Sequence, residues 1–194
     1  DGTYNITINA TDFAGNQLVI NSSTITIDNT KANVTIVVPL NGTNTSSTAL
    51  LINASVNDSL SNVFNVTFRI VSPGTATAWL FASRGSGTIS QGYWNTTFNT
   101  GTVADGVYNI TANATDFAGN QNVINGSTVT IENTPPYAAI IINNNDANTN
   151  NPFVTLNITF SDATGVKDCR FANENRVFGA YEACVTTKVW TLSA

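Results

Sequence analysis

A long internal repeat constrains this chain more than any other feature. Residues 105–134 repeat residues 1–30 at an offset of 104 residues, and 24 of the 30 positions are identical. Similarity at one long, fixed period is typical of tandem domains. Because a unit of about 100 residues can bury an ordinary core, we expect each repeat to be one small domain.

The same offset predicts where the domains begin and end. Residues 34–58 map onto residues 138–162, so a further repeat begins after the second copy of the 30-residue segment. We expect residues 1–30 to be the C-terminal hairpin of one repeat, residues 31–134 a complete domain, and residues 135–194 the N-terminal part of a third repeat. The linkers are only a few residues long, which favours consecutive domains held nearly in line.

Alternating apolar and polar residues predict strands, and no segment has a helical period. In the second copy, Tyr108, Ile110 and Ala112 alternate with polar residues, which is the pattern of a half-buried strand. Gly119 suits the left-handed position of a bulged hairpin turn, and Asp116 can cap that turn. The predicted strands of the complete domain comprise residues 33–38, 49–56, 63–71, 76–82, 93–98, 108–115 and 123–131, with loops at 41–48 and 84–87.

The pattern also predicts which side chains point into the core. The expected inward-facing residues are Val34, Ile36 and Val38 in the first strand and Phe64, Val66, Phe68 and Ile70 in the third. Seven short strands with a turn signal about every ten residues are typical of an antiparallel β-sandwich. The predicted fold class is therefore all-β.

Short motifs in the complete domain are more specific. Tyr108 stands near the start of the sixth predicted strand, where it looks like the tyrosine corner of immunoglobulin-like domains. Trp94, followed by Asp105-Gly106-x-Tyr108 and Ala114-Thr115-Asp116-x-Ala118-Gly119-Asn120, resembles the bacterial immunoglobulin-like, or fibronectin type III-like, tandem repeats of prokaryotic surface proteins. The resemblance implies tandem Ig-like sandwiches of about 104 residues that serve in adhesin stalks, surface layers or fibres. Residues 31–134 lack the cysteine pair of an antibody domain, so no antigen-binding role is implied.

Composition argues against several functions. Charged residues make up only 10% of the chain and the net charge is −5, so no basic patch is available for nucleic acid. Histidine is absent and no carboxylates cluster in the sequence, so we do not expect an enzyme. No run of eighteen apolar residues occurs, and no membrane span is predicted in this segment.

The glycosylation acceptor Asn-x-Ser/Thr is the strongest chemical signal. It occurs fourteen times, about twice as often as chance placement would give. An outward strand face of alternating Asn and Thr would produce the motif without glycans, but asparagine is disfavoured in strands. We therefore predict N-linked glycans on several of these residues: Asn5, Asn9, Asn21, Asn33, Asn41, Asn44, Asn53, Asn57, Asn65, Asn95, Asn109, Asn113, Asn125 and Asn157.

The two cysteines, Cys169 and Cys184, are open to three interpretations: a disulfide, a metal pair or free thiols. Two cysteines without histidine make a poor metal site, and free thiols are unusual on a polar surface protein. We predict a disulfide, which implies an oxidising, extracellular setting.

Acidic residues at the linkers and hairpin turns raise the question of calcium. Asp28 and Glu132 stand beside linkers, and Asp12 and Asp116 stand in the hairpin turns, where calcium could bridge domains. Turn capping accounts for the second pair and ordinary solvation for the first. The sequence therefore favours no cofactor and leaves calcium at the domain linkers as the alternative.

The leading functional hypothesis is a structural repeat unit of an extracellular filament, stalk or surface layer. Its partners would be other copies of itself, assembled head to tail at the cell surface, because a hairpin without its body needs one from a neighbour. The alternative is an adhesin that recognises a host or neighbouring cell surface. Only residues 69–91, with Trp79 and Phe81, and the cysteine-bearing unit depart from the repeat enough to supply a specific binding surface.

Overall fold

The protein is all-β and divides into two compact units, Asp1–Asn133 and Thr134–Ala194. The structure is a computed structural model that describes residues 1–174 and 176–192. Besides strands, the described residues contain two short 3-10 turns, η1 (Thr100–Thr102) and η2 (Asn143–Asn145). Each unit is described below by itself.

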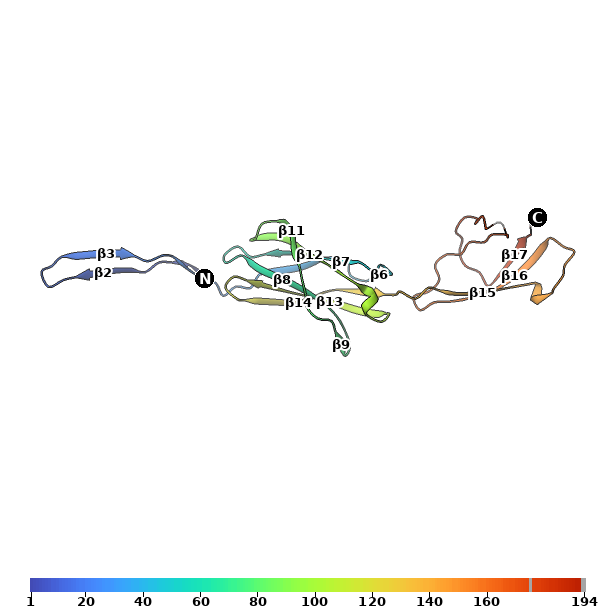
Figure 1. Cartoon of the computed structure of the whole chain (residues 1–194), viewed down its shortest axis with the longest axis horizontal. Helices are drawn as coiled ribbons and strands as arrows, with labels where there is room; N and C mark the ends of the chain where they lie inside the picture. The colour runs from blue at the N-terminus through green and yellow to red at the C-terminus, as the bar shows by residue number, and fades with distance from the viewer. Residues whose placement is uncertain (175, 193–194) are drawn as a thin grey trace. The chain divides into compact units, whose positions relative to one another are not determined.

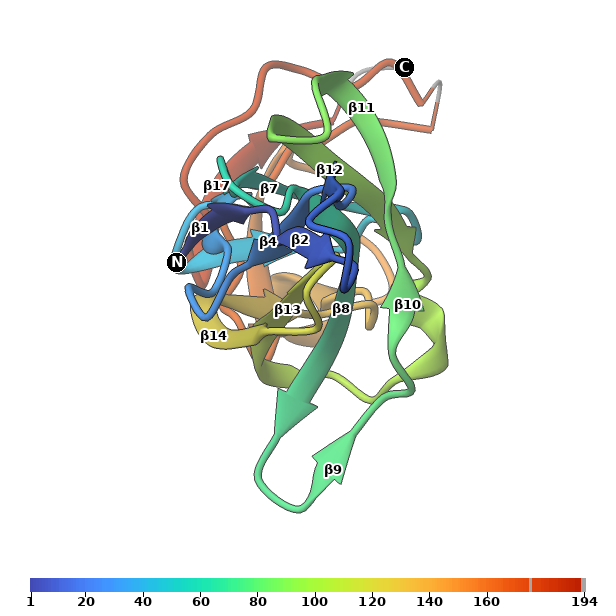
Figure 2. The same cartoon turned by 90° about the vertical axis from the view of Figure 1, so that its left-hand side faces the viewer.

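The first unit contains a sandwich of two sheets (Figure 1). One sheet has four antiparallel strands in the order β11 (Ser83–Gly87), β12 (Gln91–Phe98), β7 (Leu50–Asn57) and β5 (Asn33–Val38). The other has the order β10 (Leu80–Phe81), β8 (Val63–Ser72), β13 (Gly106–Asp116), β14 (Gln121–Ile131) and β6 (Thr43–Thr45), with β9 (Thr75–Ala76) also paired to β8. Figure 2 shows the chain passing from β9 and β10 on to β11, where it changes sheets.

The core lies between the two sheets and is fully closed to solvent at its centre. Phe68, Ile52 and Ile110 are completely buried, as is most of the cluster around them. At about 1.5–3 kcal/mol for each fully buried large aliphatic or aromatic side chain, this burial is the main stabilising term. The predicted antiparallel sandwich is confirmed.

A tyrosine corner stabilises the entry to β13. The Tyr108 hydroxyl donates a hydrogen bond of 2.7 Å to the carbonyl of Ala104, four residues upstream. The Tyr108 ring is buried in the core. This is the arrangement that the position of Tyr108 in the sequence predicted.

The predicted turn after β13 is also present. Gly119 has a φ of +92°, and the Asp116 carboxylate accepts hydrogen bonds from the amide and the side chain of Asn120 at 2.8 and 2.9 Å. The first copy folds in the same way: Asp12 accepts the corresponding bonds from Asn16, both at 2.8 Å. The repeated sequence therefore builds the same loop twice.

Two inward-facing predictions were wrong. Phe64 is exposed and stacks edge-on against Phe117, while Val63 is buried, because a bulge shifts the pairing of β13 with β8 at this end. Val38 is also exposed, since the register of β5 against β7 shifts after Ile36. An added residue on one strand reverses the alternation beyond it.

Three predicted boundaries also need correction. Residues 84–87 are not a loop but belong to β11, which pairs with β12 as an edge strand. The predicted loop 41–48 contains β6, which pairs in parallel with β14. The predicted strand 76–82 forms only the short segments β9 and β10. Glycine, serine and threonine in edge strands produce no alternation from which a strand can be recognised.

Residues 1–30 form a hairpin that exposes the side chains its copy buries. Its strands are β1 (Gly2–Tyr4), β2 (Thr7–Thr11), β3 (Gln17–Asn21) and β4 (Ile25–Ile27), paired β1 to β4 and β2 to β3. Ile6 is 71% exposed, whereas its counterpart Ile110 is 0% exposed. The difference lies in the surroundings, because the two sequences are nearly the same.

The second unit has one sheet and a small core. Its strands are β15 (Tyr137–Ile142), β16 (Phe153–Ser161) and β17 (Thr187–Thr191), with β16 in the middle. Val154, Leu156 and Ile158 are buried under Phe171 and Trp190. Most of the connection from β16 to β17 lacks strands, and Cys169 makes only an isolated bridge with Glu182.

Candidate functional site

All fourteen glycosylation acceptors lie in described residues, and none is buried. Five are partly covered on strands: Asn53, Asn65, Asn95, Asn113 and Asn157. The other nine are exposed: Asn5, Asn9, Asn21, Asn33, Asn41, Asn44, Asn57, Asn109 and Asn125. Accessibility of the side chain is necessary for modification, so the exposed group contains the better acceptors.

Some acceptors stand directly opposite one another. Asn53 on β7 pairs with Asn95 on β12, and Asn33 on β5 pairs with Asn57 on β7. Directly opposite residues on antiparallel strands have Cβ atoms about 4.5–5.5 Å apart. Two glycans cannot occupy that space, so we expect at most one member of each pair to be modified.

The predicted cysteine pair is a disulfide. Cys169 and Cys184 are joined, with their Cα atoms 5.0 Å apart. Next to Cys169, the bridging residue Glu182 also makes an ion pair with Lys188 at 2.7 Å. The bond therefore ties together a long connection that has little regular structure.

Tyr93, Trp94, Trp79 and Phe81 are aromatic residues of the kind that can bind sugars, but the structure does not gather them on one surface. Tyr93 lies on β12 of the four-stranded sheet, while Phe81 lies on β10 of the other sheet. Trp94 is buried in the core. Trp79 stacks against Arg69, whose guanidinium carbon lies 4.5 Å from the ring centre.

Three buried aspartates from separate segments meet beside the linker. Asp28 follows β4, Asp58 follows β7 and Asp116 ends β13. One carboxylate oxygen from each residue lies within 4.8 Å of the others. Two of the four linker and turn acids considered from the sequence, Asp28 and Asp116, are thus brought together, whereas Asp12 is exposed in its own turn.

Asp58 was missed by the sequence analysis. It is separated from the other two by 30 and 58 residues, so no local motif connects them. Its recurrence as Asp162 at the repeat offset of 104 was the available signal.

Backbone amides and side-chain amides hold the cluster rigidly. Asp58 Oδ1 accepts from the amides of Leu60, Ser61 and Asn62 at 3.0–3.1 Å. The side chain of Asn120 donates to Asp116 Oδ2 and to the Asp28 carbonyl, both at 2.9 Å. The loops of the sandwich therefore hold the linker by hydrogen bonds, and these bonds keep the Asp28 carboxylate close to the carboxylates of Asp58 and Asp116.

Asp28 has one oxygen that accepts no hydrogen bond of ordinary geometry from the described residues. It is only 7% exposed, its Oδ1 accepts from the Thr30 amide at 2.9 Å, and its Oδ2 is buried without a hydrogen-bond partner. The nearby Ser61 hydroxyl and the Thr30 amide lower the pKa of Asp28 from its ordinary value, although Ser61 Oγ completes no bond of ordinary geometry. The carboxylate is therefore ionised at neutral pH.

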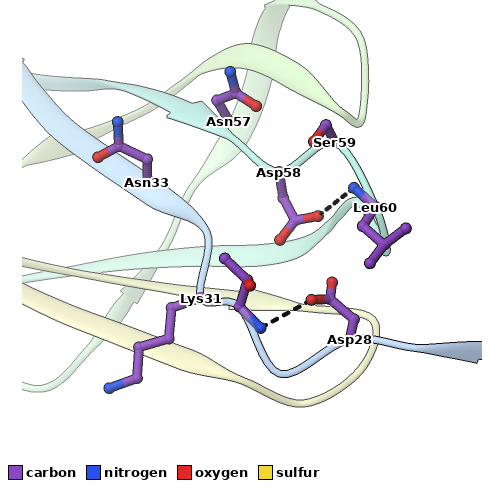
Figure 3. Close-up of a pocket in the computed structure, with 8 residues that line it drawn as sticks. Asp28, Lys31, Asn33, Asn57, Asp58, Ser59 and Leu60 are labelled. Atoms are coloured by element: carbon purple, nitrogen blue, oxygen red, sulfur yellow. Dashed lines mark hydrogen bonds between the residues drawn. The ribbon is translucent and has the colours of Figure 1, made fainter. Parts of the chain in front are cut away.

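A surface pocket of about 500 Å³ leads to these carboxylates. Figure 3 shows Asp28 and Asp58 with their carboxylates turned toward one another and the Lys31 amine directed away from both. The ion pairs found among the described residues, Lys167–Asp168 and Lys188–Glu182, both lie in the other unit. No cationic side chain within the described residues neutralises the cluster.

Comparison with known proteins identifies the repeat. Residues 92–168 match the family model of the bacterial Ig-like domain (group 3). These residues are similar to bacterial Ig-like domains. The match includes the tyrosine corner, the turn motif and the start of the next repeat, and the resemblance inferred from the sequence is confirmed.

Solved structures similar to the chain have low identity. One is an engineered protein at 20% identity and a TM-score of 0.41, covering 53% of this chain and 20% of that chain. Another is the Clostridium thermocellum CbhA fibronectin(III)-like modules, at 18% identity and a TM-score of 0.38, covering 83% of this chain and 80% of that chain. The chain thus spans only a fifth of the first of these. No curated protein matches it.

The bacterial Ig-like match and the disulfide together indicate a secreted or surface protein. Bacterial Ig-like domains are structural modules and typically non-catalytic. Among the helices described, none is long and apolar enough to cross a membrane.

Proposed function

We propose that the chain is a structural repeat unit of an extracellular filament, stalk or surface layer of a bacterial or archaeal cell. Its repeats are joined head to tail, and N-linked glycans cover part of the outer surface. The observation that carries this proposal is the contrast between the two copies of the hairpin.

The contrast concerns identical side chains in different surroundings. Tyr108 and Ile110 pack into the sandwich because β13 pairs with β8 on one side and β14 on the other. Their counterparts Tyr4 and Ile6 are exposed, and the first arm of that hairpin pairs only with the second. An apolar face beside an unpaired strand edge is stable only when a further sheet covers it.

The natural cover is a sandwich body equivalent to residues 31–102. The preceding repeat of a longer polypeptide would supply it, or a neighbouring copy would do so by strand exchange. The second unit has an apolar surface that such a hairpin could cover. Ile140 and Ile142 line an open pocket there with Leu156 and Trp190. A contact of hairpin on body joins two different surfaces and therefore extends into a filament.

Glycans fit the same surface. The chain has few charges, and like charges are the usual protection of exposed strand edges against pairing. Bulky glycans on exposed acceptors such as Asn44 in β6 and Asn41 just before it would provide that protection instead. Intact-mass measurement of the native glycoprotein tests this part of the proposal.

Assembly is tested by changing the hairpin face without changing its fold. Sedimentation velocity and electron microscopy of the native chain should show linear multimers, and Ile6→Asp should shorten them. The matched control is Ala14→Asp on the loop of the same hairpin, because its counterpart Ala118 stays exposed in the sandwich. A chain that stays monomeric at all concentrations, or equal loss of multimers in both variants, would contradict head-to-tail assembly between copies.

The adhesin alternative has one supporting observation. The segment from β9 to β10 extends from the sandwich (Figure 2), and it carries the exposed Phe81 and Trp79, whose ring stacks against Arg69 of β8. Exposed aromatic residues are frequent anchors of binding surfaces. Loss of cell-surface adhesion in Trp79→Ala, with multimers intact, would favour an adhesin over a structural repeat.

A further inference from the structure

We propose that Asp28, Asp58 and Asp116 bind a calcium ion that locks the linker onto the loops of the following sandwich. The inference goes beyond the structural role and does not depend on assembly between copies. It rests on the charge of the cluster, on its unsatisfied oxygen and on the spacing of its ligands.

The charge argument is that three buried carboxylates face one another. Their oxygens lie within 4.8 Å, and all three residues are over nine-tenths buried. Within the described part of the chain, no ion pair involves them. Burying like charges without a partner is costly, and proteins usually satisfy such groups with a cation.

The unsatisfied oxygen shows where a cation would bind. Two hydrogen bonds of Asp28 anchor the linker: Oδ1 accepts from the Thr30 amide, and the carbonyl accepts from the Asn120 side chain. Oδ2 is buried and has no partner, and it belongs to the carboxylate that faces Asp58 and Asp116. A cation between the three carboxylates would satisfy it.

The ligand set favours calcium. Calcium binds six to eight oxygens at about 2.3–2.6 Å, so oxygens on opposite sides of the ion lie about 4.6–5.2 Å apart. Magnesium demands a near-ideal octahedron at about 2.0–2.1 Å, keeps several of its waters and is usually held by only one or two carboxylates. Three carboxylate oxygens within 4.8 Å of one another can all reach one calcium ion, and water entering through the pocket would complete its coordination.

The repeat supplies an independent argument. The positions 104 residues beyond Asp28 and Asp58 are Glu132 and Asp162, so a carboxylate recurs at both. The first of these differs between the copies, yet its negative charge is kept. Two of the three ligand positions of the cluster therefore recur as carboxylates in the sequence.

Calcium titration of the metal-free chain tests the site. Isothermal titration calorimetry with calcium chloride should show one ion per chain, in the range of about 10⁻⁴–10⁻³ M typical of extracellular modules. Asp116→Asn should weaken binding at least about tenfold, since ligand charge sets the affinity. The matched control is Asp12→Asn, which lies in the same Asp-Phe-Ala-Gly-Asn turn and makes the same contacts to Asn16.

Two further measurements keep the test decisive. If Asp116→Asn does not fold by circular dichroism, Asp28→Asn replaces it, because Asp28 lies outside the strands of the sandwich. Absence of binding by the folded wild type at about 10 mM calcium, above the usual extracellular range, would refute the site. Equal weakening by Asp12→Asn, or tighter binding of magnesium than calcium, would also overturn the assignment.

Discussion

Truncating the same isoleucine in the two copies of the hairpin should lower the free energy of unfolding by very different amounts. Ile110→Ala removes three carbon atoms from a side chain that is fully buried between the sheets. The lost transfer free energy is about 2.4 kcal/mol at about 0.8 kcal/mol per carbon. With the cavity left behind, we expect the free energy of unfolding of the sandwich to fall by about 3–4 kcal/mol.

The matched variant is Ile6→Ala, at the same position of the first copy. Because Ile6 is 71% exposed, its truncation should change the stability of the dilute chain by less than about 0.5 kcal/mol. Differential scanning calorimetry measures both, and the loss at Ile110 should lower Tm by about 12 °C or more in a domain of this size.

Two outcomes would refute this reasoning. A loss below about 1 kcal/mol for Ile110→Ala would mean that the side chain is not in a closed core. An equal loss for Ile6→Ala in dilute, monomeric chain would mean that the first hairpin is covered within the same molecule. Under conditions in which multimers form, by contrast, Ile6→Ala should weaken them.

Three further predictions follow from the surface, the turn and the disulfide. Peptide mass spectrometry of the native glycoprotein should find glycans at the exposed pair Asn33 and Asn57, with occupancies of the two sites that sum to no more than one per molecule. Asn16 lowers the pKa of Asp12 through its side chain and amide, so Asp12 should titrate below its ordinary value by NMR, and Asn16→Ala should raise its pKa. The carboxylate's support of this turn is therefore present at neutral pH and lost as acid takes the pH through that lowered pKa. Reduction of the disulfide, whose cysteines are 15 residues apart, should destabilise the second unit by about 3 kcal/mol and leave the sandwich transition unchanged in calorimetry.

Sequence periodicity predicted the architecture well because the sandwich has two apolar inner faces. Alternation located β5, β7, β8, β12, β13 and β14, and Tyr108 predicted the corner that the structure contains. Alternation failed where the position of a residue depends on pairing with a strand that is distant in the sequence. The bulge that turns Phe64 outward depends on the pairing of β13 with β8, and β11 is a strand only because β12 lies beside it.

The sequence analysis considered two of the three clustered aspartates but favoured capping and solvation for them, for a similar reason. Asp28 and Asp116 attracted attention because they lie at a linker and a turn, which are recognisable locally. Asp58 follows an ordinary strand, and its role depends on three loops meeting at one end of the sandwich. Long-range convergence of this kind leaves no local pattern, although the repeat offset preserved its carboxylate as Asp162.

The parallel pairing of β6 with β14 has a mechanical consequence. β6 lies just after the chain enters the sandwich and β14 just before it leaves, and the two strands run in the same direction with Val129 opposite Thr43. Tension applied to the two ends of the domain would slide these strands past each other. The hydrogen bonds between them include Glu132 N to Thr45 O at 3.0 Å and Gly42 N to Thr128 O at 2.9 Å. Under such tension these bonds would be loaded in shear, so they would have to break together and not one after another. These parallel hydrogen bonds would therefore oppose separation of the two ends of the domain.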